Sequence, residues 1–414
     1  MKSIITPFIE QLIGLIQSKG TNYTDILVQE GQNIRYYAPT GWTDLGVQAD
    51  MGDVDSFVLS ILHKDPEEIS EVYLDLATNG ALCMGCIISG TRVRVDISLS
   101  TYTAPPAEGL VSDDILVGHP SIELCIRKHS PILSLPQLGF PPSLSDLLKK
   151  RSGLILITGQ TGSGKTSTAA SMLQFINEEM QSHIVCIQDP NEFHVENSSA
   201  VFSYKEVGRD TPSFSRAVYD SVRQRAEVIF ISELRDRETT WQALNASYSS
   251  LVICTTHAPN AEEGLARLLN FFPGDDERMV LRMLAGSIAC VISQAILPTE
   301  NREAFKMFFE YIPGKNPLLA NGLKSKGQFE LLRQGLKDVT EQLLAQKSKD
   351  VNDDRNRGLI PMNIRLIQSL AKEEIGFDAA VRASPDPETL VTSWEFAKSE
   401  RNRRRAEAEK LEKN

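Results

Sequence analysis

Residues 159–166 carry the clearest chemical signal in the sequence: glycines, a lysine and a threonine at the spacing G-x-x-x-x-G-K-[ST]. An apolar run, 154–157, precedes the pattern, and a helix-favouring run, 167–172, follows it. In such a strand–loop–helix, the glycines let backbone N–H groups and the helix N-terminus face an anion. The segment therefore predicts a site for a nucleoside triphosphate, whereas without this context it would be an ordinary glycine-rich turn.

The side chains of this segment have separate expected tasks. Lys165 would reach the β- and γ-phosphates, and the Thr166 hydroxyl would be a ligand of Mg²⁺. The other positions would surround the phosphates. The predicted nucleotide contacts are Gly159, Gln160, Thr161, Gly162, Ser163, Gly164, Lys165, Thr166 and Ser167.

Three more side chains that could take part in phosphate chemistry follow apolar, strand-like runs. Glu233 comes just after the run at 228–231, where a carboxylate could hold Mg²⁺ through water. Glu192 follows HIVCIQDPN and could polarise an attacking water, and His257 ends the run LVICTTH. Each also has a plain structural explanation: a surface acid after a strand, a turn at Asp-Pro, and a histidine satisfied within the fold.

The order of the apolar runs predicts how these residues are positioned. Residues 1–105 combine a helix with strand-like pieces and suggest a small α+β domain with an antiparallel sheet. Residues 106–152 are expected to be linker and connecting helices. In 153–300, strands alternate with helices, which predicts a parallel sheet covered on both faces. Residues 301–414 are expected to be helical and polar, ending in a solvated, charged tail.

Composition sets limits on function and location. The chain has 414 residues, 41% of them hydrophobic, and a formal net charge of -11. This charge argues against direct binding to nucleic acid or anionic lipid. We find no signal-peptide pattern and no apolar window long enough to span a membrane. Cys83 and Cys86 could form half of a zinc site, but we favour buried thiols in a strand hairpin, which fits a reducing cytoplasm.

Taken in order, the motifs resemble the secretion ATPase family of type IV pilus and type II/IV secretion systems. The resemblance covers the central region almost continuously and extends upstream through TDILVQEGQNIRYYAPTGW and GTRVRVD, and downstream through 362–390. The central segments are GLILITGQTGSGKT, HIVCIQDPNE, KEVGRDTPSFSRAV, VIFISELRDRETTWQAL, LVICTTHAPNA, LARLLNFFP and VISQAIL.

The resemblance implies an α/β fold in which an N-terminal PAS-like α+β domain is followed by a RecA-like P-loop core and C-terminal helices. It implies ATP and Mg²⁺ as ligands and a homohexameric ring. Lys165 and Thr166 would belong to the Walker A motif, Glu192 to the Asp box as candidate catalytic base, Glu233 to Walker B and His257 to the His box. Arg92, Arg94 and Arg127 match arginines that approach the phosphates from the same or a neighbouring subunit.

Some positions depart from the family pattern. Gln188 stands where the Asp box usually has glutamate, Ser232 where Walker B usually has glycine, and Ser250 where a histidine is common. The last of these weakens any mechanism with two histidines. Because Lys165 and Glu233 are retained with Glu192, we still expect hydrolysis, with a non-hydrolysing, nucleotide-dependent scaffold or regulator as the alternative.

The family resemblance also suggests a cellular role. A four-cysteine zinc motif, typical of pilus assembly ATPases, has no counterpart here, so the chain is nearer the retraction branch and its Dot/Icm-like and conjugative relatives. We expect a cytoplasmic motor at the cytoplasmic face of the inner membrane, attached through platform or secretion-system proteins and without direct contact to nucleic acid. Pilus retraction is the alternative.

Overall fold

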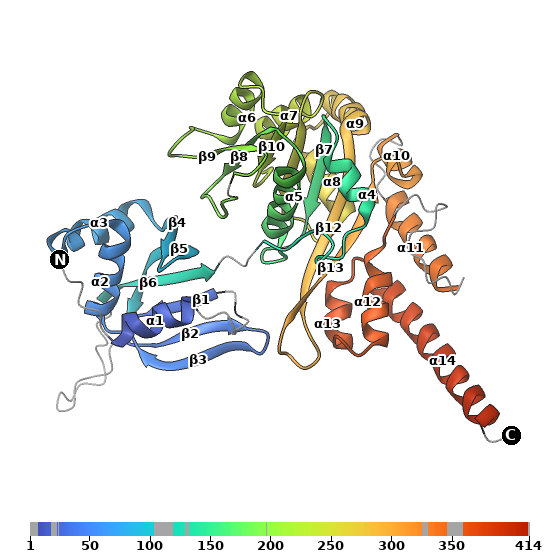
Figure 1. Cartoon of the computed structure of the whole chain (residues 1–414), viewed down its shortest axis with the longest axis horizontal. Helices are drawn as coiled ribbons and strands as arrows, with labels where there is room; N and C mark the ends of the chain where they lie inside the picture. Colours follow the sequence, from blue (N-terminus) through green and yellow to red (C-terminus); the bar gives the residue numbers. More distant parts are fainter. Residues whose placement is uncertain are drawn as a thin grey trace. The chain divides into compact units, whose positions relative to one another are not determined.

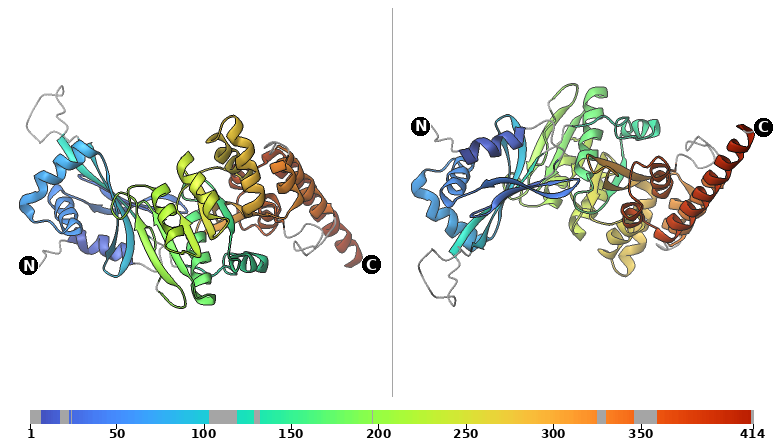
Figure 2. Two further views of the ribbon diagram at one scale, coloured as in Figure 1. Left: turned by 90° about the horizontal axis from the view of Figure 1, so that it is seen from above. Right: turned by 90° about the horizontal axis from the view of Figure 1, so that it is seen from below.

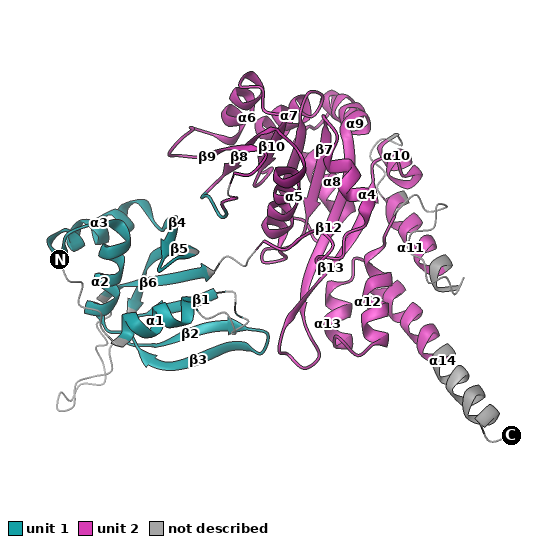
Figure 3. Cartoon of the chain, viewed as in Figure 1, with its two compact units in different colours: residues 1–131, 190–193 teal, residues 132–189, 194–414 magenta. Residues whose placement is uncertain are grey.

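The computed structural model describes residues 7–17, 23, 25–102, 119–128, 132–195, 197–324, 330–345 and 359–412 (Figure 1). The chain forms two compact units. Unit 1 contains residues 1–131 together with 190–193, and unit 2 contains 132–189 together with 194–414 (Figure 3).

Unit 1 is an α+β domain built on an antiparallel sheet with the order β3-β2-β1-β6-β5-β4. Alternate residues of β5, such as Val93, Val95 and Ile97, are fully buried, and they pack with apolar side chains of the helices. Its elements are α1 (Pro7–Gln17), β1 (Asp25–Gln29), β2 (Asn33–Ala38), β3 (Gly41–Gln48), α2 (Met51–Leu62), a 3-10 turn (Pro66–Glu68), α3 (Ile69–Asn79), β4 (Leu82–Ile88), β5 (Thr91–Tyr102) and β6 (His119–Lys128).

The sequence places the end of this domain at residue 105, but the structure extends it. Strand β6 lies between β1 and β5 in the sheet, with Ile122, Leu124 and Ile126 buried. Every second residue of this segment is therefore buried, as in a strand of a sheet and unlike a connecting segment. Cys83 and Cys86 lie on β4, which pairs with β5 as the expected hairpin.

Unit 2 is built on a seven-stranded sheet with the order β13-β12-β7-β11-β10-β8-β9, in which only the β12–β13 pair is antiparallel. The predicted parallel sheet is confirmed. Its central strands at 153–158, 228–231 and 251–256 are buried at every residue and mostly apolar, because both faces of the sheet are covered. The strands are β7 (Gly153–Thr158), β8 (His183–Gln188), β9 (Val201–Glu206), β10 (Val228–Ile231), β11 (Leu251–Thr256), β12 (Ile288–Pro298) and β13 (Phe305–Pro313).

Helices cover both faces of this sheet. One face packs in a single apolar cluster with α6 (Phe214–Arg223), α7 (Arg237–Ala246), α8 (Ala261–Asn270) and α9 (Asp275–Ser287). Helix α5 (Lys165–Glu179) contacts β7 and β11 and is also in contact with α4 (Pro142–Leu148).

The described residues after β13 are mostly helical, and some of these helices pack beside the β12–β13 hairpin (Figure 2). The sheet continues past residue 300, where the sequence places the end of the core, because Phe308, Phe309 and Ile312 of β13 are buried against it. The helices are α10 (Pro317–Lys324), α11 (Glu330–Ala345), α12 (Met362–Ala371), α13 (Phe377–Ala383) and α14 (Pro387–Glu412). Within the described ranges, none of the helices is both apolar and long enough to cross a membrane.

Candidate nucleotide site

The phosphate loop connects β7 to α5, as the strand–loop–helix pattern predicts. Gly162 and Gly164 have φ angles of 78° and 82°, in the left-handed region that glycine adopts without strain. Gly164 is also the N-cap of α5, so the loop leads directly into a helix N-terminus. A methyl group at Gly164 would lie 2.9 Å from Cδ1 of Ile296, so any larger residue there would also have to displace this side chain.

Lys165 lies inside the loop and is 7% exposed. Its Nζ donates hydrogen bonds to the carbonyl oxygens of Gly159 at 2.9 Å and Gln160 at 3.0 Å. It also lies 3.2 Å from Nδ1 of His257. These partners offset the cost of burying an ammonium group. They also hold the charge at the loop, where phosphate oxygens would be bound.

His257 follows β11 and contacts the same loop. Its Nδ1 lies 3.4 Å from Oγ1 of Thr161 as well as close to Lys165. An ammonium group can only donate, so Nδ1 acts as the acceptor, and the proton of the neutral ring is on Nε2. Nε2 lies 3.9 Å from Oε1 of Glu233. The network thus assigns the tautomer and turns the N–H of His257 towards that carboxylate.

Glu233 and His257 meet because β10 and β11 are parallel neighbours, with Ile231 beside Cys254. The carboxyl ends of parallel strands share one sheet edge, where α/β proteins bind ligands. The sequence therefore indicates the correct edge for both side chains. Arg267 of α8 fixes the His257 segment by donating to the His257 carbonyl oxygen at 2.9 Å.

The donors near the loop fit Mg²⁺ bound with a triphosphate. Thr166 is in the first turn of α5, and the Glu233 side chain is 26% exposed. Mg²⁺ typically takes one or two protein oxygens and completes its shell with phosphate oxygens and water. Several buried oxygens here have no partner: Thr158 Oγ1, Ser163 Oγ, Thr256 Oγ1 and Gln294 Oε1. Unpaired buried polar atoms are uncommon and concentrate at sites that a ligand or water completes.

The three predicted arginines lie on adjacent strands of unit 1. Arg94 on β5 is opposite Arg127 on β6, and Arg127 pairs with Asp25 at 2.7 Å. Arg94 Nη1 lies 3.3 Å from Oε1 of Glu192, which belongs to the 190–193 segment of unit 1. Arg92 is on β5, but its side chain lies outside the described part of the structure.

The structure brings two polar residues near the site that the sequence analysis did not identify. Arg235 Nη2 donates to Asp189 Oδ2 at 2.6 Å, and its guanidinium lies 4.6 Å from the centre of the Phe214 ring. Gln294 of β12 donates from Nε2 to the Ser163 carbonyl oxygen at 2.6 Å. The position of Arg235, two residues after Glu233, could have indicated that it lies near the site. Gln294 has no such signal, because its partner is distant in sequence.

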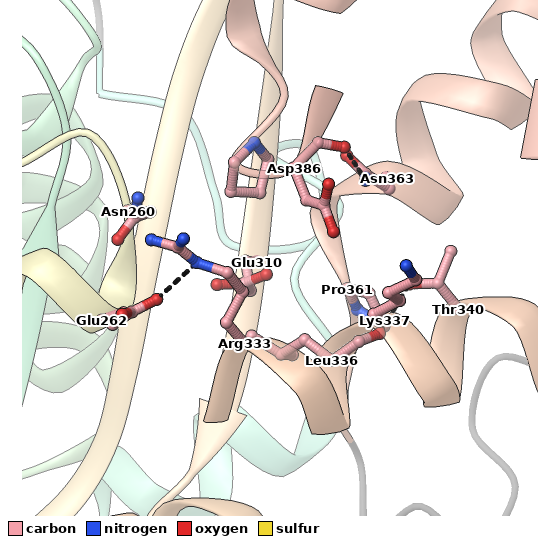
Figure 4. A pocket seen from close by; sticks show the side chains of 11 residues that line it. Asn260, Glu262, Glu310, Arg333, Leu336, Lys337, Thr340, Pro361, Asn363 and Asp386 are labelled. Carbon is pink, nitrogen blue, oxygen red and sulfur yellow. Dashed lines mark hydrogen bonds and ion pairs between the residues drawn. The ribbon is translucent and has the colours of Figure 1, made fainter. Parts of the chain in front are cut away.

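A second concave region lies at the start of α8, where Asn260 is the helix N-cap (Figure 4). Its volume of about 30 Å³ is enough for one or two waters. Glu262 is paired there with Arg333 Nε at 2.7 Å. Glu310 is almost fully buried, and this burial raises its pKa to about 7.

Comparison with known proteins identifies a family. The model described as Type II/IV secretion system protein matches residues 123–349, more than half of the chain. The type IV pilus ATPase PilU of Pseudomonas aeruginosa is 33% identical over 217 residues, which cover 52% of this chain and 56% of PilU. The chain spans about half the length of the curated relatives it matches.

Two solved structures share the fold over most of the chain. The Legionella pneumophila ATPase DotB has a TM-score of 0.69 at 19% identity, covering 92% of this chain and 95% of DotB. The pilus retraction motor PilT, solved with bound ADP, has a TM-score of 0.66 at 25% identity, covering 92% of this chain and 97% of PilT. The predicted α/β fold, with an N-terminal α+β domain and a RecA-like core, is therefore confirmed.

Proposed function

Because this chain belongs to the type II/IV secretion system protein family, we propose that it is an ATP-hydrolysing motor of a type IV secretion, conjugative transfer or type IV pilus system. One observation carries the proposal most directly. Lys165 of the phosphate loop, His257 and Glu233 form a connected polar group at the carboxyl edge of the parallel sheet. This group has the cation and the carboxylate that P-loop nucleotide hydrolysis uses, with a hydrogen-bonding ring between them.

We assign the phosphate contacts to the loop itself. Backbone groups from Gly159 to Ser167 would surround the phosphates, and Lys165 would exchange its carbonyl partners for β- and γ-phosphate oxygens. Thr166 and Glu233 would hold Mg²⁺, which supplies charge neutralisation at the phosphates when bound. His257 would keep Lys165 aligned while its Nε2–H faces Glu233.

The remaining roles in the proposal belong to unit 1. Glu192 would polarise the attacking water. Arg92, Arg94 and Arg127 would balance the charge that develops on the phosphoryl oxygens in the transition state. The ion pair between Arg94 and Glu192 supports a shared task, since each side chain limits the positions open to the other.

The proposed working form is a homohexamer at the cytoplasmic face of the inner membrane. It would be held there by platform or secretion-system proteins, since the net charge of -11 disfavours direct attraction to anionic lipid or nucleic acid. ATP binding and release would change the angle between domains, because a ligand shifts a conformational equilibrium by its differential affinity for the two states.

Pilus retraction is a second candidate function. It is favoured by PilU, a type IV pilus ATPase, and by the PilT retraction motor, which at 25% identity is nearer in sequence than DotB at 19%. Capture of membrane partners by the full chain distinguishes the candidates. Recovery of a pilus platform protein supports a pilus role such as retraction, and recovery of a transfer or secretion component supports secretion or conjugative transfer.

The test of the activity is steady-state phosphate release by the purified full chain with ATP and Mg²⁺. We expect release by the wild-type protein and none above background from Lys165→Ala. Nucleotide binding without turnover would instead favour the scaffold alternative.

A further inference from the structure

Gln294 lies on β12, is 1% exposed and contacts the phosphate loop. Its Nε2 donates to the carbonyl oxygen of Ser163 at 2.6 Å. The two residues are far apart in sequence, but β12 and β7 are parallel neighbours, with Ser293 beside Thr158. The position of Gln294 is therefore fixed by the sheet.

Both ends of the loop approach β12 closely. A methyl group at Gly159 would lie 2.6 Å from the Gln294 carbonyl oxygen. A methyl group at Gly164 would lie 3.3 Å from Gln294 Nε2 and 2.9 Å from Ile296 Cδ1. The conformation of the loop is thus set by its contact with β12 as well as by its own glycines.

The hydrogen bond from Gln294 also fixes the direction of one peptide unit. In a planar trans peptide, the C=O and the following N–H point in opposite directions. Because the Ser163 carbonyl points towards Gln294, the Gly164 N–H points away from β12. This N–H belongs to the loop and stands at the N-terminus of α5, where an anion is favoured.

We propose that Gln294 is a positioning residue for phosphate binding. It holds the Ser163–Gly164 peptide so that the Gly164 N–H faces the phosphates, and it does so without touching the nucleotide. The inference rests on the proposed function in so far as the loop binds a nucleotide. The orientation of the peptide can be measured in the protein without nucleotide.

The test compares three variants of the full chain. Gln294→Met keeps a similar size and removes the donor, which leaves the buried Ser163 carbonyl unpaired. Gln294→Glu keeps the shape but puts a carboxylate against that carbonyl. The matched control is Gln334→Met on α11, where the exposed Gln334 amide donates to Asp338 at 2.9 Å.

We expect faster hydrogen exchange at the amides of 159–167 in Gln294→Met, with β7 and β12 protected as in the control. Nucleotide affinity should fall roughly ten-fold, as expected for a buried carbonyl that loses its donor. Gln294→Glu should regain affinity as the pH falls, because a protonated buried carboxyl group can again donate to Ser163. A purely structural role would not produce this pH dependence.

Unchanged loop exchange and unchanged affinity in Gln294→Met, relative to Gln334→Met, would overturn the inference. Exchange that increases equally across β7 and β12 would also overturn it, since Gln294 would then support the sheet and not the loop. If the wild-type protein binds no nucleotide, the proposed function fails, but the exchange comparison still tests the positioning of the loop.

Discussion

Nζ of Lys165 lies 3.2 Å from Nδ1 of His257, on a ring whose other nitrogen faces Glu233. This contact joins the phosphate loop to the strand ends of β10 and β11. In this contact Nδ1 of His257 is the acceptor, because an ammonium group can only donate. The cation that would bind phosphate is therefore held by a ring nitrogen as well as by two carbonyl oxygens of the loop.

The first prediction concerns this contact. His257→Ala removes one acceptor of Lys165 and leaves the bonds to the Gly159 and Gln160 carbonyls. We expect ATP turnover to fall roughly 100-fold, a typical loss for one positioned polar group in a catalytic site, with a smaller change in ATP affinity. His257→Asn, which keeps an acceptor oxygen, should retain more activity than the alanine variant in steady-state phosphate release. Equal turnover in the wild type and both variants would refute the role of His257.

The second prediction concerns Glu233. Glu233→Gln keeps the shape of the side chain and removes its charge, so it should weaken the hold on Mg²⁺ and slow hydrolysis while ATP still binds. We expect the variant to retain ATP after gel filtration, where the wild-type protein retains ADP. The control is Glu227→Gln. Glu227 is exposed, lies just before β10 and is outside the site, so this variant also loses one carboxylate. Rapid loss of ATP from Glu233→Gln, or turnover at the wild-type rate, would count against the assignment.

The sequence is sufficient to predict where the main candidate site residues lie. The glycine spacing located the loop, and the apolar runs before Glu233 and His257 placed both at the carboxyl edge of a parallel sheet, because such runs are typical of strands buried on both faces. The fold class followed from the same alternation of strands and helices.

The features that sequence patterns could not reveal depend on contacts between distant segments. The sequence of β6 alone suggests a connecting segment, and only its pairing with β1 and β5 identifies it as a strand of the sheet. Gln294 belongs to an ordinary apolar strand, and only the packing of β12 against the loop makes it notable. Likewise, no local pattern indicates that 190–193 packs within unit 1.

The third prediction uses that segment. Gly85 on β4 is opposite Arg94 on β5, and a methyl group at Gly85 would lie 2.6 Å from the carbonyl oxygen of Asn191. Gly85→Ala should therefore displace the segment that carries Glu192. We expect kcat for ATP hydrolysis to fall at least about ten-fold, as misplacement by about 1 Å can cost more than that, while nucleotide affinity is maintained.

The control for this prediction is Gly14→Ala on α1, where an added methyl group has no atom within 4 Å. This variant should hydrolyse ATP like the wild-type protein. If Gly85→Ala matches it in kcat, then the position of Glu192 does not limit turnover.

The fourth prediction concerns pH and Glu310. Burial raises its pKa from 4.5 to about 7, so between these values the folded protein binds a proton that the unfolded chain has released. The contribution of Glu310 to stability is thus fully present below about pH 4.5, decreases as the pH rises, and is lost above about 7. Nearby charged groups are Glu262 on α8, Arg333 and Lys337 on α11, and Asp386.

Glu310→Gln removes this titration. We expect the variant to gain stability relative to the wild type as the pH rises from 4.5 to 7, by on the order of 3 kcal/mol at the upper end. Chemical denaturation across this range measures the difference. The control is Glu341→Gln, at an exposed position, and its stability should change with pH as that of the wild type does. A difference in stability between Glu310→Gln and the wild type that stays constant with pH would contradict the raised pKa of Glu310.

The most direct measurement is phosphate release by the full chain and by Lys165→Ala, with nucleotide binding followed in the same samples. The account predicts ATP- and Mg²⁺-dependent release by the wild-type protein and background release by the variant, whose folded state is verified by thermal unfolding. Equal release by both proteins, or nucleotide binding by the wild type with no release at all, would contradict the proposal that this chain is an ATP-driven motor.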